Sequence, residues 1–180
     1  GAAAAAATAH GLMLPAHGLV THTWFCPAQY DREYQKKLHD KIKGGGISSV
    51  FFVDFSESYE DLLMIAEHVD KLVVLDHHKT AQADLEGRDW PANVQVVFDM
   101  ERSGAGIAWD FFHPGQPRPR LINHVEDRDI WKWELDNSRM FTEGLGIQKD
   151  NYDTWLNLLI ACQTDEIYEG IIKDGITINT

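Results

Sequence analysis

KLVVLDHHKTAQ, residues 71–82, places a run of four apolar residues directly before an aspartate, two histidines and a lysine. A short apolar run rich in β-branched residues is typical of a buried strand. In an open parallel sheet, ligands bind outside the carboxyl ends of the strands. The stretch therefore predicts a core strand whose tip, from Asp76 to His78, forms a functional site.

Two neighbouring segments repeat the pattern of an apolar run followed by an aspartate. ISSVFFVDF, residues 47–55, follows three glycines and contains Asp54, and NVQVVFD, residues 93–99, ends at Asp99. An aspartate after a strand often caps the next helix, which is the ordinary interpretation of each one alone. The two histidines that follow Asp76 favour a site instead.

The segments between these strands have helical spacing. In SESYEDLLMIAEHVD, residues 56–70, apolar residues recur at helical intervals, and Ser58 with Asp61 predicts a capped start. Strand, helix and strand in short succession predict an α/β fold, a parallel sheet flanked by helices. We expect strands near residues 48–54, 71–76 and 94–99, helices on both faces, and a mostly helical C-terminal portion after the proline-rich HPGQPRPR.

Composition limits the environment and the partners. The net charge of −12 disfavours a broad duplex nucleic-acid surface, because phosphate neutralisation dominates such binding. No stretch is apolar enough to span a membrane, and Cys26 and Cys162 form no disulfide framework. We expect a soluble chain in a reducing compartment, either the cytoplasm or, if the alanine-rich start is a processed transit segment, an organelle matrix.

Four segments together resemble the DHH phosphoesterase superfamily, which is named for the tripeptide at residues 76–78. They are FFVDFS, VVLDHHKTA, FDMERSGAGIAWDFF and LINHVEDRDIWKWEL, and they occur in the family's order. The resemblance implies two segments: a low-complexity or divergent stretch at residues 1–26 and a DHH-like α/β domain at residues 27–180. It also implies Mn²⁺- or Mg²⁺-dependent hydrolysis of phosphodiester or phosphoanhydride bonds.

The resemblance also implies roles for individual residues. Asp54 would bind metal as a bridging carboxylate, His77 would bind metal through its imidazole, and Asp127 would supply a further carboxylate. Asp76 would support the histidines, and His78 would face the scissile phosphate. Asp129 is the less favoured alternative to Asp127, and both also suit a charged helix end.

Two further features suit phosphate or base binding. Arg102, Ser103 and Gly104 begin a predicted helix, where an arginine and free backbone amides would hold an anion. Small residues there also allow close packing of helix and sheet. Trp109, Trp131 and Trp133 suit stacking on bases of single-stranded nucleic acid, although we expect them to pack under the helical half.

The family's first motif, a histidine with two nearby aspartates, has no match. Residues 1–19 contain His10 and His17 but no carboxylate. Asp54, His77 and Asp127 therefore suffice for one Mn²⁺ or Mg²⁺ ion and fall short for two. The family's second domain, with its substrate-binding loop, is also not found.

The matched segments, together with the missing first motif and second domain, leave two candidate functions. The first is a metal-dependent phosphoesterase domain acting on a phosphate-containing small molecule or a short oligonucleotide. The alternative is a catalytically inactive DHH-like pseudoenzyme that serves as a structural or interaction subunit and binds protein partners.

Overall fold

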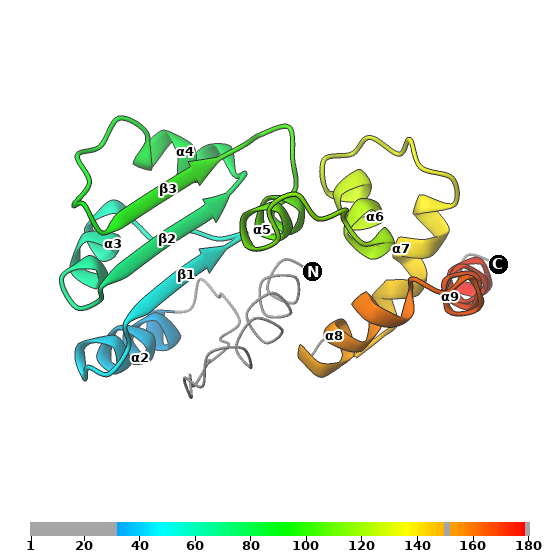
Figure 1. The fold of residues 1–180 in the computed structure, drawn as a ribbon, viewed down its shortest axis with the longest axis horizontal. Helices are drawn as coiled ribbons and strands as arrows, with labels where there is room; N and C mark the ends of the chain where they lie inside the picture. Colours follow the sequence, from blue (N-terminus) through cyan, green and yellow to red (C-terminus); the bar gives the residue numbers. More distant parts are fainter. Residues whose placement is uncertain (1–31, 150–151, 179–180) are drawn as a thin grey trace. The chain divides into compact units, whose positions relative to one another are not determined.

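The structure is a computed structural model that describes residues 32–149 and 152–178 (Figure 1). The described residues fall into two compact units, one ending at Met100 and the other beginning at Glu101. The predicted low-complexity segment at residues 1–26, and with it His10 and His17, lies outside the described residues.

The first unit is built on a parallel sheet of three strands. They are β1 (Ser49–Val53), β2 (Lys71–Asp76) and β3 (Val94–Phe98), in the order β1-β2-β3. Val53 pairs with Leu75, and Asp76 pairs with Phe98, so the carboxyl ends of the strands meet at one edge. The predicted strands and their parallel direction are confirmed. The central strand β2 is buried along its length after Lys71.

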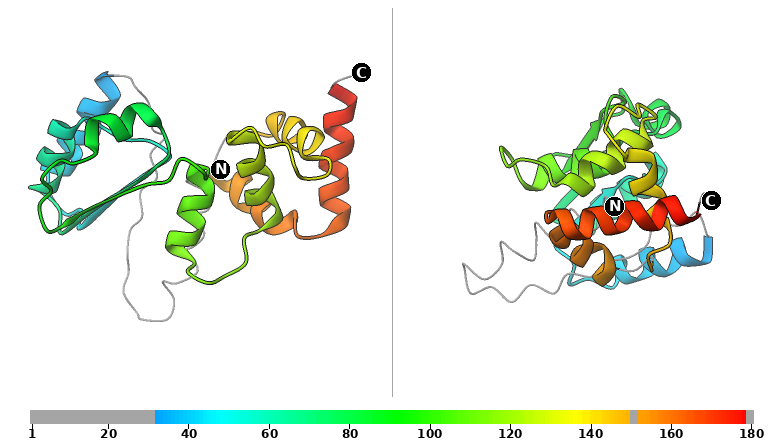
Figure 2. Two further views of the ribbon diagram at one scale, coloured as in Figure 1. Left: turned by 90° about the horizontal axis from the view of Figure 1, so that it is seen from above. Right: turned by 90° about the vertical axis from the view of Figure 1, so that its right-hand side faces the viewer.

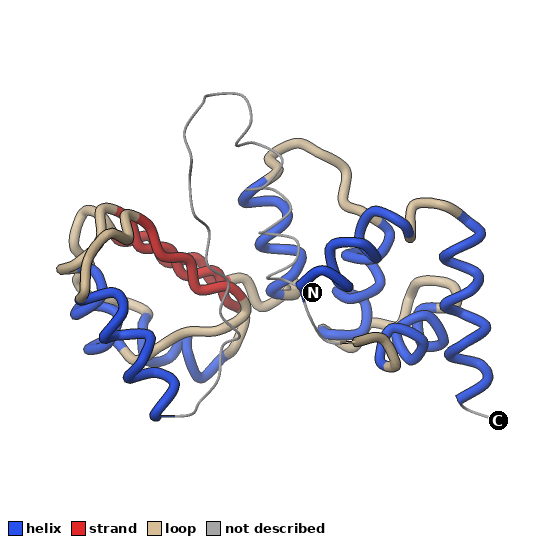
Figure 3. Tube along the Cα trace, turned by 90° about the horizontal axis from the view of Figure 1, so that it is seen from below, coloured by secondary structure: helices blue, strands red, loops and turns tan. Residues whose placement is uncertain are grey.

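Three helices pack on one face of this sheet. They are α2 (Arg32–Lys43), α3 (Tyr59–Ala66) and α4 (Lys79–Leu85). Each contributes to a single core cluster with the same strand face: Ile42, Leu62 and Leu85 join Phe52, Leu72 and Val74. Figure 2 (left) and Figure 3 show these helices on the same side of the strands.

The expected helices on both faces are therefore not found among the described residues of this unit. The strand order accounts for the shared face of α3 and α4. Two successive crossovers of one hand that step the same way across a sheet place their helices on the same face. The start of α3 agrees with its predicted cap, because the Ser58 hydroxyl accepts from the Asp61 amide at 3.2 Å.

The second unit is helical in its described residues, as predicted for the C-terminal portion. Its helices are α5 (Gly104–Phe112), α6 (Arg120–Asp129), α7 (Ser138–Gly146), α8 (Tyr152–Ala161) and α9 (Asp165–Ile178). The proline-rich stretch connects α5 to α6. None of the described helices combines the length and apolar character needed to cross a membrane.

Candidate metal site

Asp54 lies immediately after β1, at the carboxyl edge of the sheet. Its amide donates to the Leu75 carbonyl at 2.8 Å, which ties it to the end of β2. Its φ of 60° is in the left-handed region, which few residues other than glycine adopt, although aspartate is among the more tolerant. Such strained backbone often lies at functional sites, and here it presents a partly exposed carboxylate.

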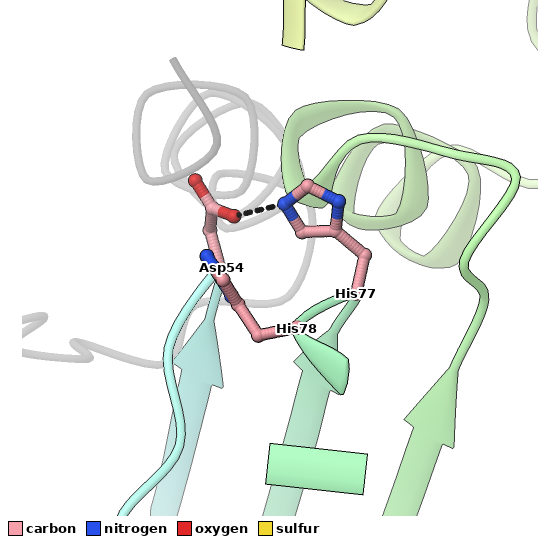
Figure 4. A group of neighbouring side chains, drawn as sticks. All are labelled: Asp54, His77 and His78. Carbon is pink, nitrogen blue, oxygen red and sulfur yellow. Dashed lines mark ion pairs between the residues drawn. The ribbon is translucent and has the colours of Figure 1, made fainter. Parts of the chain in front are cut away.

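The imidazoles of His77 and His78 gather beside this carboxylate. His77 Nε2 lies 3.1 Å from Asp54 Oδ1 (Figure 4), and the ring centroids of His77 and His78 are 4.7 Å apart. One ligand atom from each of the three residues lies within 4.8 Å of the others. In residues 32–149 and 152–178, no other group of three or more metal-ligating side chains comes together in this way.

The buried Asp76 carboxylate holds both histidines in place. Its Oδ1 accepts the His77 amide at 2.7 Å, the His78 amide at 3.2 Å and His78 Nδ1 at 2.6 Å. Its Oδ2 accepts the Ser56 hydroxyl at 2.5 Å, a contact that is not predicted from the sequence. Because the carboxylate accepts from His78 Nδ1, that nitrogen carries a proton and Nε2 remains for a ligand or a substrate.

Both histidines approach the Asp54 carboxylate. The alternation of side chains along a strand does not reach them, because β2 ends at Asp76 and His78 is already the residue before α4. The structure therefore adds His78 to the metal-capable group, beside its predicted role toward the phosphate. One carboxylate and two neutral imidazoles suit Mn²⁺ and similar divalent ions, so the donor set fits the expected metal chemistry.

Asp127 belongs to the second unit, where its carboxylate organises the connection after α6. Its two oxygens accept the amides of Glu134 at 2.8 Å and Leu135 at 3.3 Å. Burial would raise the pKa of this carboxyl, but the neighbouring Ser138 side chain and the hydrogen bonds from these two amides hold it below the usual value. The predicted metal-binding role of Asp127 stays a prediction. Asp129, the less favoured alternative, is exposed at the end of the same helix.

Arg102, Ser103 and Gly104 lie where a phosphate site was predicted, at the start of α5. Arg102 donates to the Gly106 carbonyl and to Asp110, both at 2.6 Å. The Ser103 hydroxyl accepts from the Gly106 amide, while the Ser103 amide donates to the Glu126 carboxylate at 3.1 Å. A carboxylate of the chain itself thus occupies the helix start, and phosphate binding there stays a prediction that requires Glu126 to move.

Glu57 is a titratable residue that sequence reasoning missed. It is 6% exposed, and its Oε2 accepts Gln35 Nε2 at 3.0 Å. Burial, assisted by the nearby charge of Asp61, raises the pKa of the Glu57 carboxyl to about 7. Nothing in its polar neighbourhood, DFSESYE, indicates burial, because the core contacts come from distant segments.

Comparison with known proteins gives one similar sequence. The chain is 32% identical over 138 residues to uncharacterized protein R106 of Acanthamoeba polyphaga mimivirus. The match covers 75% of this chain and 31% of the viral protein, so the chain spans about a third of that relative's length. No known family matches the sequence, and no solved structure matches it.

Proposed function

We propose that this chain is a DHH-type, divalent-metal phosphoesterase domain that binds one Mn²⁺ or Mg²⁺ ion. The observation that carries the proposal is the gathering of Asp54, His77 and His78 at the carboxyl edge of a parallel sheet. Ligands favour this edge in open α/β sheets. The four DHH-like segments support the same activity class.

The chemistry assigned to each residue follows from its contacts. Asp54 and His77 offer a carboxylate oxygen and an imidazole nitrogen that already lie 3.1 Å apart. His78, fixed by Asp76, presents Nε2 to the third ligand position or to a phosphoryl oxygen, where it accepts or donates a proton. A bound divalent ion would supply a Lewis acid that stabilises charge on the phosphoryl group.

A second candidate function is a pseudoenzyme that keeps the ion site without turnover. Specific contacts favour it: Asp127, Arg102 and Ser103 are engaged within the second unit, where Asp127 binds backbone amides. Two closely spaced divalent ions need several anionic oxygens, and the described metal-capable group has one carboxylate. We therefore expect slow hydrolysis at best from this chain.

The test combines metal titration with an activity assay on the full 180-residue chain. Calorimetric titration with Mn²⁺ should show one site that disappears in His77→Ala. His68→Ala is the matched control, because His68 is exposed and its Nδ1 contacts the Met64 carbonyl on α3, away from the cluster. Hydrolysis of bis(p-nitrophenyl) phosphate and short oligonucleotides is then measured with excess Mn²⁺.

The outcomes separate the two candidates. Slow, Mn²⁺-dependent hydrolysis that is lost in His77→Ala and retained in His68→Ala would establish the phosphoesterase. One-site binding with no hydrolysis of any substrate would favour the pseudoenzyme. A chain that binds no Mn²⁺, or binds it equally after His77→Ala, would contradict both.

A further inference from the structure

The connection between α6 and α7 has an unusual backbone. Trp131, Trp133 and Asn137 have φ values of 62°, 56° and 60°. The left-handed region brings Cβ too close to the backbone of an L residue, so a tryptophan there costs conformational free energy. Two tryptophans within three residues adopt this conformation, although backbone preference favours glycine there. Such a conflict between residue type and backbone is often found at functional sites.

Trp131 stands where helices commonly place glycine. Its amide donates to the Arg128 carbonyl at 3.0 Å, so it is the left-handed residue that follows the end of α6. The side chain is also 73% exposed, the most exposed of the large hydrophobic residues that the structure describes. Neither backbone preference nor burial explains a tryptophan at this position.

Asp127 fixes the conformation of this segment. Its carbonyl accepts the amides of Lys132 at 2.9 Å and Trp133 at 3.3 Å, and its carboxylate accepts the next two amides. The Asp127 side chain is buried, and these hydrogen bonds hold the backbone that follows it in one conformation. The ring of Trp131 is therefore presented on a preorganised loop.

The surroundings of Trp131 combine aromatic rings with charged groups of both signs. The Trp133 ring lies edge-on to it at a centroid distance of 5.3 Å, and the Arg139 guanidinium lies 5.1 Å from the centre of the Trp133 ring. Arg128 and Lys132 flank Trp131 in sequence and are exposed, as are two acidic neighbours, Asp129 and Glu134. An open aromatic ring beside cations suits a planar base and its adjoining phosphates.

We propose that Trp131 is a stacking platform for an unpaired base of single-stranded nucleic acid. Of the three tryptophans weighed for this role, Trp109 is 8% exposed and stacks on His113, so it belongs to the packed interior. Stacking also suits the chain's charge of −12, because it needs no broad basic surface. The proposal does not rest on the metal site, whose residues lie in the other unit.

The test measures binding of the full chain to a fluorescein-labelled oligothymidylate of roughly six nucleotides, without added metal. A matched abasic oligonucleotide keeps the phosphates and lacks the bases. Trp131→Gly should weaken oligothymidylate binding about ten-fold or more and should leave abasic binding unchanged. The same variant should melt no lower than the original chain, because glycine adopts the left-handed conformation without strain.

Two further variants make the result specific. Trp131→Phe keeps an aromatic ring and should retain part of the affinity. Asn137→Gly relieves the third left-handed residue, whose side chain makes no capping hydrogen bond, and should leave binding unchanged. The proposal is overturned if the chain binds no oligothymidylate, binds it and the abasic strand equally, or keeps its affinity in Trp131→Gly.

Discussion

Asp76 illustrates how a single buried carboxylate organises the candidate metal site. It is 1% exposed, and burying a charge is costly unless hydrogen bonds replace its hydration. Four donors do so: the Ser56 hydroxyl, two backbone amides and His78 Nδ1. The same hydrogen bonds fix the orientation of His78. They therefore both stabilise the buried Asp76 carboxylate and set the geometry of the site.

Glu57 carries a pH-dependent effect on stability. Its pKa is raised from 4.5 to about 7, so the folded state binds a proton that the unfolded state releases between those values. Stability should therefore fall as pH rises through this window and should level off above about pH 7. The penalty at higher pH is at most about 3–4 kcal/mol, since one pKa unit corresponds to about 1.4 kcal/mol.

Glu57→Gln tests this effect because the amide keeps the shape and cannot ionise. We expect the free energy of unfolding in urea to rise relative to the original chain at about pH 8, and to differ little at about pH 4.5. Glu60→Gln, on the exposed surface of α3, is the control and should show no such pH-dependent gain. A Glu57→Gln gain that is the same at both pH values would contradict the assignment.

At the scale of elements, glycines set how closely α7 and α9 approach. A Cβ on Gly175 would lie 1.8 Å from the Met140 carbonyl oxygen, and one on Gly144 would lie 2.0 Å from the Ile171 carbonyl oxygen. These are backbone atoms, which cannot move away by a change of rotamer as side-chain atoms can. The crossing of the two helices therefore requires glycine at both positions.

Gly175→Ala should destabilise the chain by about 1–3 kcal/mol or more, because the helices must move apart. Gly170→Ala is a matched control on the same helix, where a Cβ meets nothing within 4 Å. It should stabilise the chain by up to about 1 kcal/mol through helix propensity. Urea unfolding followed by circular dichroism measures both, and equal effects of the two substitutions would show that the close crossing is not formed.

At the scale of the whole molecule, the sheet could be predicted because its signal is local. Apolar, β-branched runs that end at an aspartate define all three strands, and the spacing between them requires parallel pairing. The positions of Asp54 and His77 follow from the same rule, since parallel strands end at one edge. The proposed chemistry rests on the resemblance of four segments to the DHH superfamily, because the strand pattern alone does not specify it.

Other features could not be predicted because they depend on contacts between distant segments. The burial of Glu57 comes from packing that joins α2 to the loop after β1, and its neighbours in sequence are polar. The Ser56 contact with Asp76 joins residues 20 apart. The Glu126 carboxylate on α6 binds the Ser103 amide at the start of α5, although the two residues are 23 apart in sequence. The sequence predicted a phosphate at this helix start, and the structure has a carboxylate there.

The central claim is that Asp54, His77 and His78 bind one divalent ion, and pulsed electron paramagnetic resonance of the Mn²⁺-loaded chain tests it most directly. The echo modulation reports nitrogen bound to the ion, whether or not the chain is an active hydrolase. We predict coupling to two imidazole nitrogens, lost in His77→Ala because that variant no longer binds the ion, and unchanged in His68→Ala. A spectrum of hydrated Mn²⁺ without nitrogen coupling, or coupling that persists unchanged in His77→Ala, would contradict the account.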